Sequence, residues 1–430
     1  MPRLVQFDDL ATGPSPQLPL EAFTARRERL ADQVDGTLVV ATNPELTYSN
    51  DVEHRFRPNS DFWYLTGFAE PEAVLVLGSK TTLFCRQRQP EKEVWTGRRV
   101  GVEAAKDALA VDSAYPFDEL AERLPSLLAG PVLADVEHHA GVAETLANVT
   151  DSEDGARLIA EMRLRKEPRE VKMLQKACDI GAAAMREALP LARAGRHEYE
   201  VEAQLVSCYR RHGSTGPGYP PIVGTGANAA VLHYVDNRAA IHKRDMVLVD
   251  AGCEWGYYNS DITRTVPAAG TWSKMQRELY TLVWEAQQAA LREVRPGARM
   301  KAVHDAAVRV LAQGFADRGW IDADVDAAIA AQQHRRHYMH GTSHFLGLDV
   351  HDVGRYKDPA GDSRVLEPGM VVTVEPGLYL NPDFAPMPAG MHPLGIRIED
   401  DVLVTSDGHR NLLRDLPTDP DGVEGLLQKR

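Results

Sequence analysis

Residues 246–266 of this 430-residue chain read MVLVDAGCEWGYYNSDITRTV, and residues 370–380 read MVVTVEPGLYL. In each run a short apolar strand ends at an acidic residue, Asp250 in the first and Glu375 in the second. Asp261 follows later in the first run, and Glu399 lies in a third apolar run, GIRIEDDVLV. Ionised carboxylates within such segments are too costly to bury unless cations neutralise them. We therefore expect a pair of divalent metal ions to share these four acids.

The carboxy-terminal part of the chain contains an internal repeat. A helical stretch at 168–190, a second helix ending at Gly213 and the strand DMVLVDAG form one half. The other half has a helix at 274–294, a second helix ending at Gly319 and the strand GMVVTVEPG. RAGRHE in the first half matches RPGARM in the second. Related by a pseudo-two-fold axis, the two strand pairs would bring all four acids to the middle of one sheet.

The amino-terminal part predicts a separate domain. Strands such as TLVVAT and TTLFC alternate with helical stretches from about residue 20 to about residue 160, which is typical of a mixed α/β domain. The charged segment EMRLRKEPREVK, with Pro168 opening a helix, marks the boundary. We expect domains at 1–165 and 166–430, the first of which begins with an extended lead-in that ends in GPSPQLPL. We expect Trp95 to be a packing residue, with an exposed tryptophan at an interface as the alternative.

Composition limits the classes of function. A net charge of −14 argues against a nucleic-acid surface or a polybasic membrane anchor. No apolar run approaches the ~18 residues of a membrane span, and the first residues do not have the pattern of a signal peptide. The four cysteines are scattered and read as reduced thiols. We expect a soluble cytoplasmic protein that binds neither nucleic acid nor membranes.

The fifteen histidines differ in their surroundings. In HRRHYMH, residues 334–340, we expect His334 and His337 to lie in a solvated polar loop. HGTSH, residues 340–344, lacks the glutamate of a zincin helix, which disfavours that class. His344 and His351 have apolar neighbours just before the Glu375 strand, which favours one metal ligand and one proton donor. His233, in AVLHY before the Asp250 strand, is their counterpart in the first half.

Taken together, VDAG…SDITRT, HGTSHFLGLDVHD, TVEPGLY and GIRIEDD resemble the creatinase/methionine-aminopeptidase ("pita-bread") superfamily. With RPNSDFWYLTGFAEPEAVLVL, the chain is most similar to the Xaa-Pro aminopeptidase (aminopeptidase P) family. The resemblance implies an α/β (α+β) protein, with an amino-terminal creatinase-like α/β domain and a carboxy-terminal pseudo-two-fold pita-bread catalytic domain. It also implies a set of five metal ligands, in which Asp261 and Glu399 bridge the ions: Asp250, Asp261, His344, Glu375 and Glu399.

The same resemblance implies the chemistry. His233, His340 and His351 would bind substrate, and the catalytic groups would be His233, His351, Glu375 and Arg397. Two divalent ions, Mn²⁺ first with Zn²⁺ or Co²⁺ as alternatives, would hold a bridging hydroxide that attacks the carbonyl before proline. Peptides with proline at the second position would lose their amino-terminal residue. The resemblance further implies a homodimer or a homotetramer.

Two other functions stay open from the residues alone. A prolidase shares the five ligands but cleaves only Xaa-Pro dipeptides, so it needs a cation that caps the proline carboxylate. Arg397, Arg355 or another group could supply it. Some pita-bread proteins are binding modules or metal-free creatine hydrolases, because one fold can carry different functions. A methionine aminopeptidase is disfavoured, since the long amino-terminal domain would be surplus.

Overall fold

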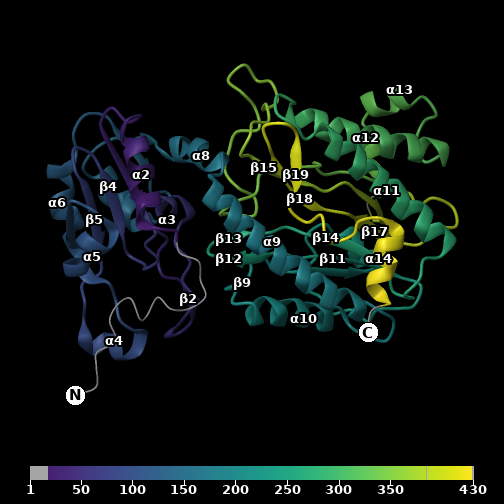
Figure 1. Cartoon of the computed structure of the whole chain (residues 1–430), viewed down its shortest axis with the longest axis horizontal. Helices are drawn as coiled ribbons and strands as arrows, with labels where there is room; N and C mark the ends of the chain where they lie inside the picture. Colours follow the sequence, from purple (N-terminus) through teal and green to yellow (C-terminus); the bar gives the residue numbers. More distant parts are fainter. Residues whose placement is uncertain (1–17, 384, 429–430) are drawn as a thin grey trace. The chain divides into compact units, whose positions relative to one another are not determined.

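The computed structural model describes residues 18–383 and 385–428, so the lead-in up to residue 17 lies outside the described residues. The described residues divide into two compact units, 18–163 and 164–428 (Figure 1). Their architecture is mixed α/β, as the sequence predicts.

The unit of residues 18–163 is built on a mixed six-stranded sheet with the order β6-β5-β4-β1-β7-β8. Its central strand, β1, pairs antiparallel with β4 and parallel with β7. The strands are β1 Thr37–Ala41, β4 Val74–Leu77, β5 Thr81–Cys85, β6 Ser113–Pro116, β7 Val132–Asp135 and β8 Glu153–Asp154. The helices are α2 Leu20–Ala31, α3 Ser60–Thr66, α4 Pro90–Thr96, α5 Gly101–Leu109, α6 Leu120–Leu127, α7 Ala140–Ala147 and α8 Ala156–Leu164.

The core of this unit forms where helices α6 and α7 cover the sheet. Alternate residues of the strands, such as Val39 on β1 and Val74 on β4, are buried there against Leu124 and Val142. A short hairpin of β2 Thr47–Ser49 and β3 Val52–Glu53 and the helix α4 are exposed instead. Trp95 on α4 is 87% exposed, so the expectation of a packing residue is wrong and the alternative of an exposed tryptophan remains. No residue of this seven-residue helix is buried.

Two helix pairs frame the strands of the unit 164–428. Helix α9 Pro168–Ala188 contacts α10 Glu198–Arg211, and α11 Lys274–Glu293 contacts α12 Met300–Asp317. In Figure 1, α10 runs along the lower edge of this unit and α12 along its upper edge. These bounds agree with the four predicted helices, and the capping boxes of α9, α10 and α11 explain where three of them begin. The described part of the chain contains no helix long and apolar enough to cross a membrane.

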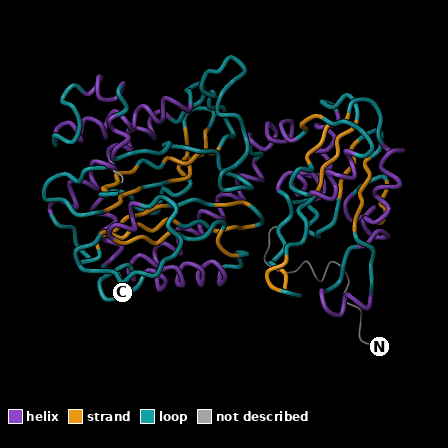
Figure 2. The backbone as a smooth tube through the Cα atoms, turned by 180° about the vertical axis from the view of Figure 1, so that it is seen from behind, coloured by secondary structure: helices purple, strands orange, loops and turns teal. Residues whose placement is uncertain are grey.

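The strands of this unit confirm the predicted repeat. Two three-stranded antiparallel sheets, β10-β11-β14 and β15-β18-β19, lie between the helices (Figures 1 and 2). An isolated bridge pairs Thr263 of β14 with Glu399, the residue just before β18, and so links the two sheets. The strands are β9 Gly216–Pro217, β10 Ile222–Thr225, β11 Met246–Asp250, β12 Cys253–Trp255, β13 Tyr258–Asn259, β14 Thr263–Pro267, β15 Val371–Val374, β16 Gly377–Leu380, β17 Leu394–Arg397, β18 Asp400–Val404 and β19 His409–Asn411. Two short helices, α13 Val325–Ala330 and α14 Pro420–Leu427, complete the unit.

The histidines of HRRHYMH do not lie in a solvated loop. His337 is only 3% exposed, and its ring centroid lies 5.4 Å from the rings of both Phe315 and Trp320. His334 is buried as well. Burial lowers the pKa of both imidazoles, because it disfavours the charged form. The expectation of a solvated loop is wrong. It followed from the neighbouring arginines in the sequence, whereas in the structure the histidines are covered by the end of α12.

This burial predicts a dependence of stability on pH. Above the ordinary histidine pKa of about 6.5, His337 is neutral in the folded and unfolded states alike. As the pH falls below that value, the unfolded chain binds a proton that the folded protein resists, so the free energy of unfolding decreases. We expect the urea midpoint to fall less between about pH 8 and about pH 5.5 in His337→Phe than in the unaltered protein.

The comparison is made in excess chelator, so that metal release does not contribute. His242→Phe, at an exposed histidine of the same unit, is the control and should keep the original pH dependence. Equal acid sensitivity of the unaltered protein and His337→Phe would contradict the assignment.

Candidate metal centre

The first two acids are brought together by the β11–β14 strand pair. Asp250 ends β11 and pairs with Thr263, the first residue of β14, while Asp261 comes two residues before Thr263. Between the two aspartates, the backbone at Gly252 lies very close to the backbone at Ser260. A Cβ on Gly252 would lie 1.7 Å from the Ser260 carbonyl oxygen. Only glycine fits this approach, which explains the DAG sequence at the end of the strand.

The second half supplies two glutamates. Glu375 follows β15, and its backbone N–H donates to the Thr342 carbonyl at 2.9 Å. Glu399 lies between β17 and β18, where its backbone N–H donates to the Thr263 carbonyl. The Thr263 hydroxyl in turn donates to Glu399 Oε2 at 2.6 Å. The junction between the sheets therefore places Glu399 beside the two aspartates.

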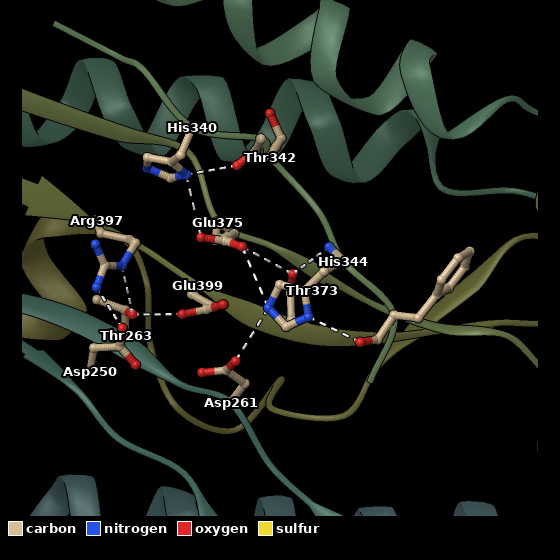
Figure 3. A network of polar contacts seen from close by, with 12 residues as sticks. Asp250, Asp261, Thr263, His340, Thr342, His344, Thr373, Glu375, Arg397 and Glu399 are labelled. Atoms are coloured by element: carbon tan, nitrogen blue, oxygen red, sulfur yellow. Dashed lines mark hydrogen bonds and ion pairs between the residues drawn. The ribbon is translucent and has the colours of Figure 1, made fainter. Parts of the chain in front are cut away.

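His344 lies between the acids of the two halves. Its Nε2 is 3.4 Å from Asp261 Oδ2 and 3.6 Å from Glu375 Oε1 (Figure 3). Its Nδ1 lies 3.0 Å from the Phe345 carbonyl oxygen, an acceptor that fixes the ring with hydrogen on Nδ1 and leaves Nε2 toward the acids. Among the described residues, Asp261, His344 and Glu399 form a group whose ligand atoms all lie within 4.8 Å of one another.

Burial makes the negative charge of this cluster unfavourable. It raises the pKa of Asp250, against the opposing effect of Arg397, and raises the pKa of Glu399 well above its usual range. It raises the pKa of Glu375 to about 7. Burial opposes the charge of His344 too, but the hydrogen bond to Asp261 and the charge of Glu375 raise its pKa to about 9. A positive charge placed among these carboxylates would therefore stabilise their ionised forms.

The donor set fits divalent cations. Four carboxylates and one imidazole are the oxygen-rich ligands that suit first-row divalent metals, and no thiol is among them. The imidazole also has the backbone acceptor that metal-ligating histidines commonly use to fix their tautomer. All five residues predicted as ligands are therefore brought to one place.

Arg397 lies behind the carboxylates. Its Nη2 donates to Asp250 Oδ2, its Nη1 to the Tyr379 hydroxyl at 2.9 Å and its Nε to Thr263 at 3.2 Å. It is buried, so its charge compensates part of the negative charge of the cluster. Arg264, a second buried arginine of the unit, pairs with Asp400 at 2.7 Å.

Three further histidines line the same cavity. The ring centroids of His233 and His351 are 6.3 Å apart, and that of His351 is 4.4 Å from His344. His340 Nε2 lies 2.8 Å from the Tyr379 hydroxyl, and its Nδ1 is 3.5 Å from Glu375 Oε2. Burial, followed by the charge of Arg397, lowers the pKa of His340 to about 3, so that its ring is neutral. Burial also lowers the pKa of His351, as does nearby His344.

The cavity itself has a volume of 660 Å³. The acids and histidines line it together with four apolar side chains: Ile222, Leu232, Val235 and Val350. A volume of this order accommodates a few residues of a peptide.

The profile of Metallopeptidase family M24 matches residues 172–406, which is more than half of the chain. The chain belongs to metallopeptidase family M24. The profile described as Aminopeptidase P, N-terminal domain matches residues 23–133. The family M24 match spans the positions of all five expected ligands.

Relatives within the family match nearly end to end. The Xaa-Pro aminopeptidase of Escherichia coli (strain K12) is 41% identical, over 95% of this chain and 97% of its own. That of Haemophilus influenzae is also 41% identical, over 96% and 98%. A solved aminopeptidase from Pseudomonas aeruginosa superposes with a TM-score of 0.92 at 38% identity, over 96% of this chain and 98% of that one. The resemblance to aminopeptidase P read from the motifs is thereby confirmed.

Sequence reasoning missed several groups of this M24 site. The Tyr219 hydroxyl is hydrogen-bonded to both Asp250 and Asp261, and Asp401 Oδ2 accepts from the Asp261 backbone N–H at 2.9 Å. Tyr219 lies in GPGYPP, a loop with no periodic pattern to mark it. Asp401 lies two residues after Glu399 in the run EDD. Its position next to an expected ligand was the one feature of the sequence that could have indicated a place in the site.

The two adjacent histidines of the M24 site provide a test of ligation. His344 Nε2 points at two carboxylates, whereas His351 lies beside it with its ring against that of His344. We expect His344→Ala to weaken metal binding by at least about tenfold and His351→Ala to keep the metal content of the unaltered protein. Elemental analysis after dialysis against metal-free buffer gives the comparison. Equal metal loss in the two variants would contradict the ligand assignment.

Proposed function

We propose that the chain is an Xaa-Pro aminopeptidase: a dinuclear metal-dependent enzyme that releases the amino-terminal residue from peptides with proline at the second position. Relatives that bear this name match almost the whole chain at 41% identity. The alternative of a metal-free binding module is disfavoured, because all five ligand residues converge in one cavity.

The described lining of the cavity offers no free cation that could bind the carboxylate of a dipeptide substrate, which argues against a dipeptidase. Among the lining residues of the cavity, all in the described part of the chain, Arg397 is the single arginine or lysine. Its guanidinium is already hydrogen-bonded to Asp250, Tyr379 and Thr263. Arg355, the other candidate for capping a proline carboxylate, is not a lining residue. A cavity without such a cap suits a substrate that continues beyond the proline.

We propose two divalent ions, held by Asp250, Asp261, His344, Glu375 and Glu399, with Asp261 and Glu399 shared between them. When bound, such ions supply a water acidic enough to attack at neutral pH and polarise the scissile carbonyl. Mn²⁺ is the first candidate, with Zn²⁺ or Co²⁺ as alternatives, because the donor set is rich in carboxylate oxygen and contains one imidazole.

The chain's own residues would bind and orient the peptide. The acidic side chains of the cavity would attract the free amino group of the substrate, which would restrict cleavage to the first peptide bond. Glu375 would accept the proton of the attacking water, because its carboxylate lines the cavity beside the other expected ligands. Arg397 would hold Asp250 in place through their hydrogen bond.

Departure of the proline nitrogen gives a role to the histidines of the cavity. An Xaa-Pro bond is a tertiary amide without an N–H. Its nitrogen, like that of any amide, must gain a proton as it departs. His233 and His351 face the cavity 6.3 Å apart between ring centroids, close enough for a peptide to contact both. We propose that they stabilise the developing oxyanion and assist departure of the nitrogen. His340, neutral and held by Tyr379, would add a substrate contact.

The remaining proposals concern organisation. We propose an amino-terminal domain at 1–165 and a catalytic domain at 166–430, assembled as a homodimer or a homotetramer, as the resemblance to aminopeptidase P implies. We also propose a cytoplasmic location, which the four buried thiols favour because free cysteines are typical of reducing compartments.

The test compares matched substrates: an Xaa-Pro dipeptide, its carboxy-terminal amide, an Xaa-Pro-Yaa tripeptide and an Xaa-Ala-Yaa tripeptide. We expect release of the first residue from Xaa-Pro-Yaa, with kcat/KM equal to or higher than for the dipeptide, since extra contacts help and no cap is lost. The amide should be cleaved at least as well as the free dipeptide. Xaa-Ala-Yaa should be a poor substrate.

Chelation provides the control, because it should abolish cleavage and added Mn²⁺ should restore it. Efficient cleavage of the free dipeptide, with little action on its amide and on the tripeptide, would show that the chain is a prolidase. An inactive protein with all five ligands and full metal occupancy would favour the binding-module alternative.

A further inference from the structure

The loop that carries His233 connects β10 to β11 and has little regular structure of its own. It begins with the 3₁₀ turn Gly226–Ala230 and continues to Met246 without a helix or a strand. Its residues Leu232, His233 and Val235 line the cavity. A histidine that contacts substrate must nevertheless be held within a fraction of an ångström of its working position. Something outside the loop has to fix it.

Glu198, the first residue of α10, accepts four hydrogen bonds that serve this purpose. Its Oε1 accepts from the Thr225 backbone N–H at 2.9 Å and from Asn228 Nδ2 at 3.2 Å. Its Oε2 accepts from the Tyr234 hydroxyl at 2.9 Å and from the Ala239 backbone N–H at 2.8 Å. One buried carboxylate, with 0% exposure, thus connects the start, the middle and the end of the loop.

A carboxylate is the side chain that suits this position. Four donors converge on it, and an ionised carboxyl group offers only acceptors. Its place in the first turn of α10 also favours negative charge, because the backbone N–H groups of a helix start point outward. The Glu198 backbone N–H donates to the Ala239 carbonyl at 3.1 Å as well, so that the residue holds the end of the loop from two sides.

The loop is also fastened at a second point. Asn237 has a left-handed backbone, with φ of 49°, and is buried. Its side chain accepts from the Val223 N–H at 2.9 Å and donates to the Pro221 carbonyl at 2.8 Å and to Glu202 Oε2 at 2.9 Å. Asn237 therefore fixes the loop to β10, whereas Glu198 reaches Tyr234, the direct neighbour of His233.

We propose that Glu198 is a positioning residue for His233, acting through the Tyr234 hydroxyl and the backbone of the loop. The inference rests on the proposed function, in which His233 contacts the substrate. Glu198 contacts none of the five ligand residues in the hydrogen bonds described, so its effect should reach turnover without a change in metal content.

The test is a double-mutant cycle with Glu198→Gln, His233→Ala and the double variant, all metal-loaded and assayed on an Xaa-Pro-Yaa tripeptide. The substitution replaces an acceptor oxygen by an amide NH₂ that would face donors, so we expect Glu198→Gln to lower kcat/KM on the order of tenfold. In the His233→Ala background the same substitution should change kcat/KM by less than about twofold, because the group that it positions is gone. Metal content should be unchanged throughout.

Two further variants guard against misfolding and against a general charge effect. Tyr234→Phe removes one of the four hydrogen bonds and keeps the carboxylate, so it should show the same dependence on His233 with a smaller effect. Glu285→Gln, the same chemical change at an exposed residue of α11, should leave kcat/KM unaltered.

The outcomes separate this inference from the function on which it rests. Equal effects of Glu198→Gln and Tyr234→Phe with and without His233 would overturn the positioning role, as would loss of metal in either variant. No effect of His233→Ala on cleavage of the tripeptide would instead overturn the role of His233 in the proposed function. A strong effect of Glu198→Gln confined to the protein that retains His233 supports both.

Discussion

The crowding of four carboxylates around one imidazole is the constraint on which the rest of the catalytic unit depends. Asp250, Asp261, Glu375 and Glu399 converge at the junction of two sheets, and burial raises the pKa of three of them. The guanidinium of Arg397 compensates part of this charge. Such a cluster is stable as carboxylates only with more positive charge than the chain itself supplies, which is the physical reason for proposing a pair of divalent ions there.

The repeated architecture produces this arrangement. Each half of the unit contributes a helix pair and an antiparallel strand pair, and the halves meet where Thr263 bridges to Glu399. The same threonine donates its hydroxyl to Glu399, so one residue both joins the sheets and orients an acid. The His233 loop of the first half and the His351 segment of the second then reach the same cavity. Each half of the repeat therefore contributes both acids and a histidine to the cavity.

The acids and the helices could be predicted from the sequence because their signals are local. An apolar strand that ends in Asp or Glu, and a helix that starts at a capping box, can be read within a few residues. Tyr219 and Asp401 were missed because their importance comes from partners at long sequence separation. His337 was misjudged for a related reason: its arginine neighbours indicate a polar loop, whereas Phe315 and Trp320 bury it. Glu198 likewise reads as an ordinary first-turn acid until its four donors are placed around it.

The most direct test of the central claim is anomalous diffraction from crystals of the Mn²⁺-loaded protein. We predict two peaks in each chain, both enclosed by Asp250, Asp261, His344, Glu375 and Glu399, with Asp261 and Glu399 contacting both. A single peak, or peaks at other residues while these five carry none, would contradict the account.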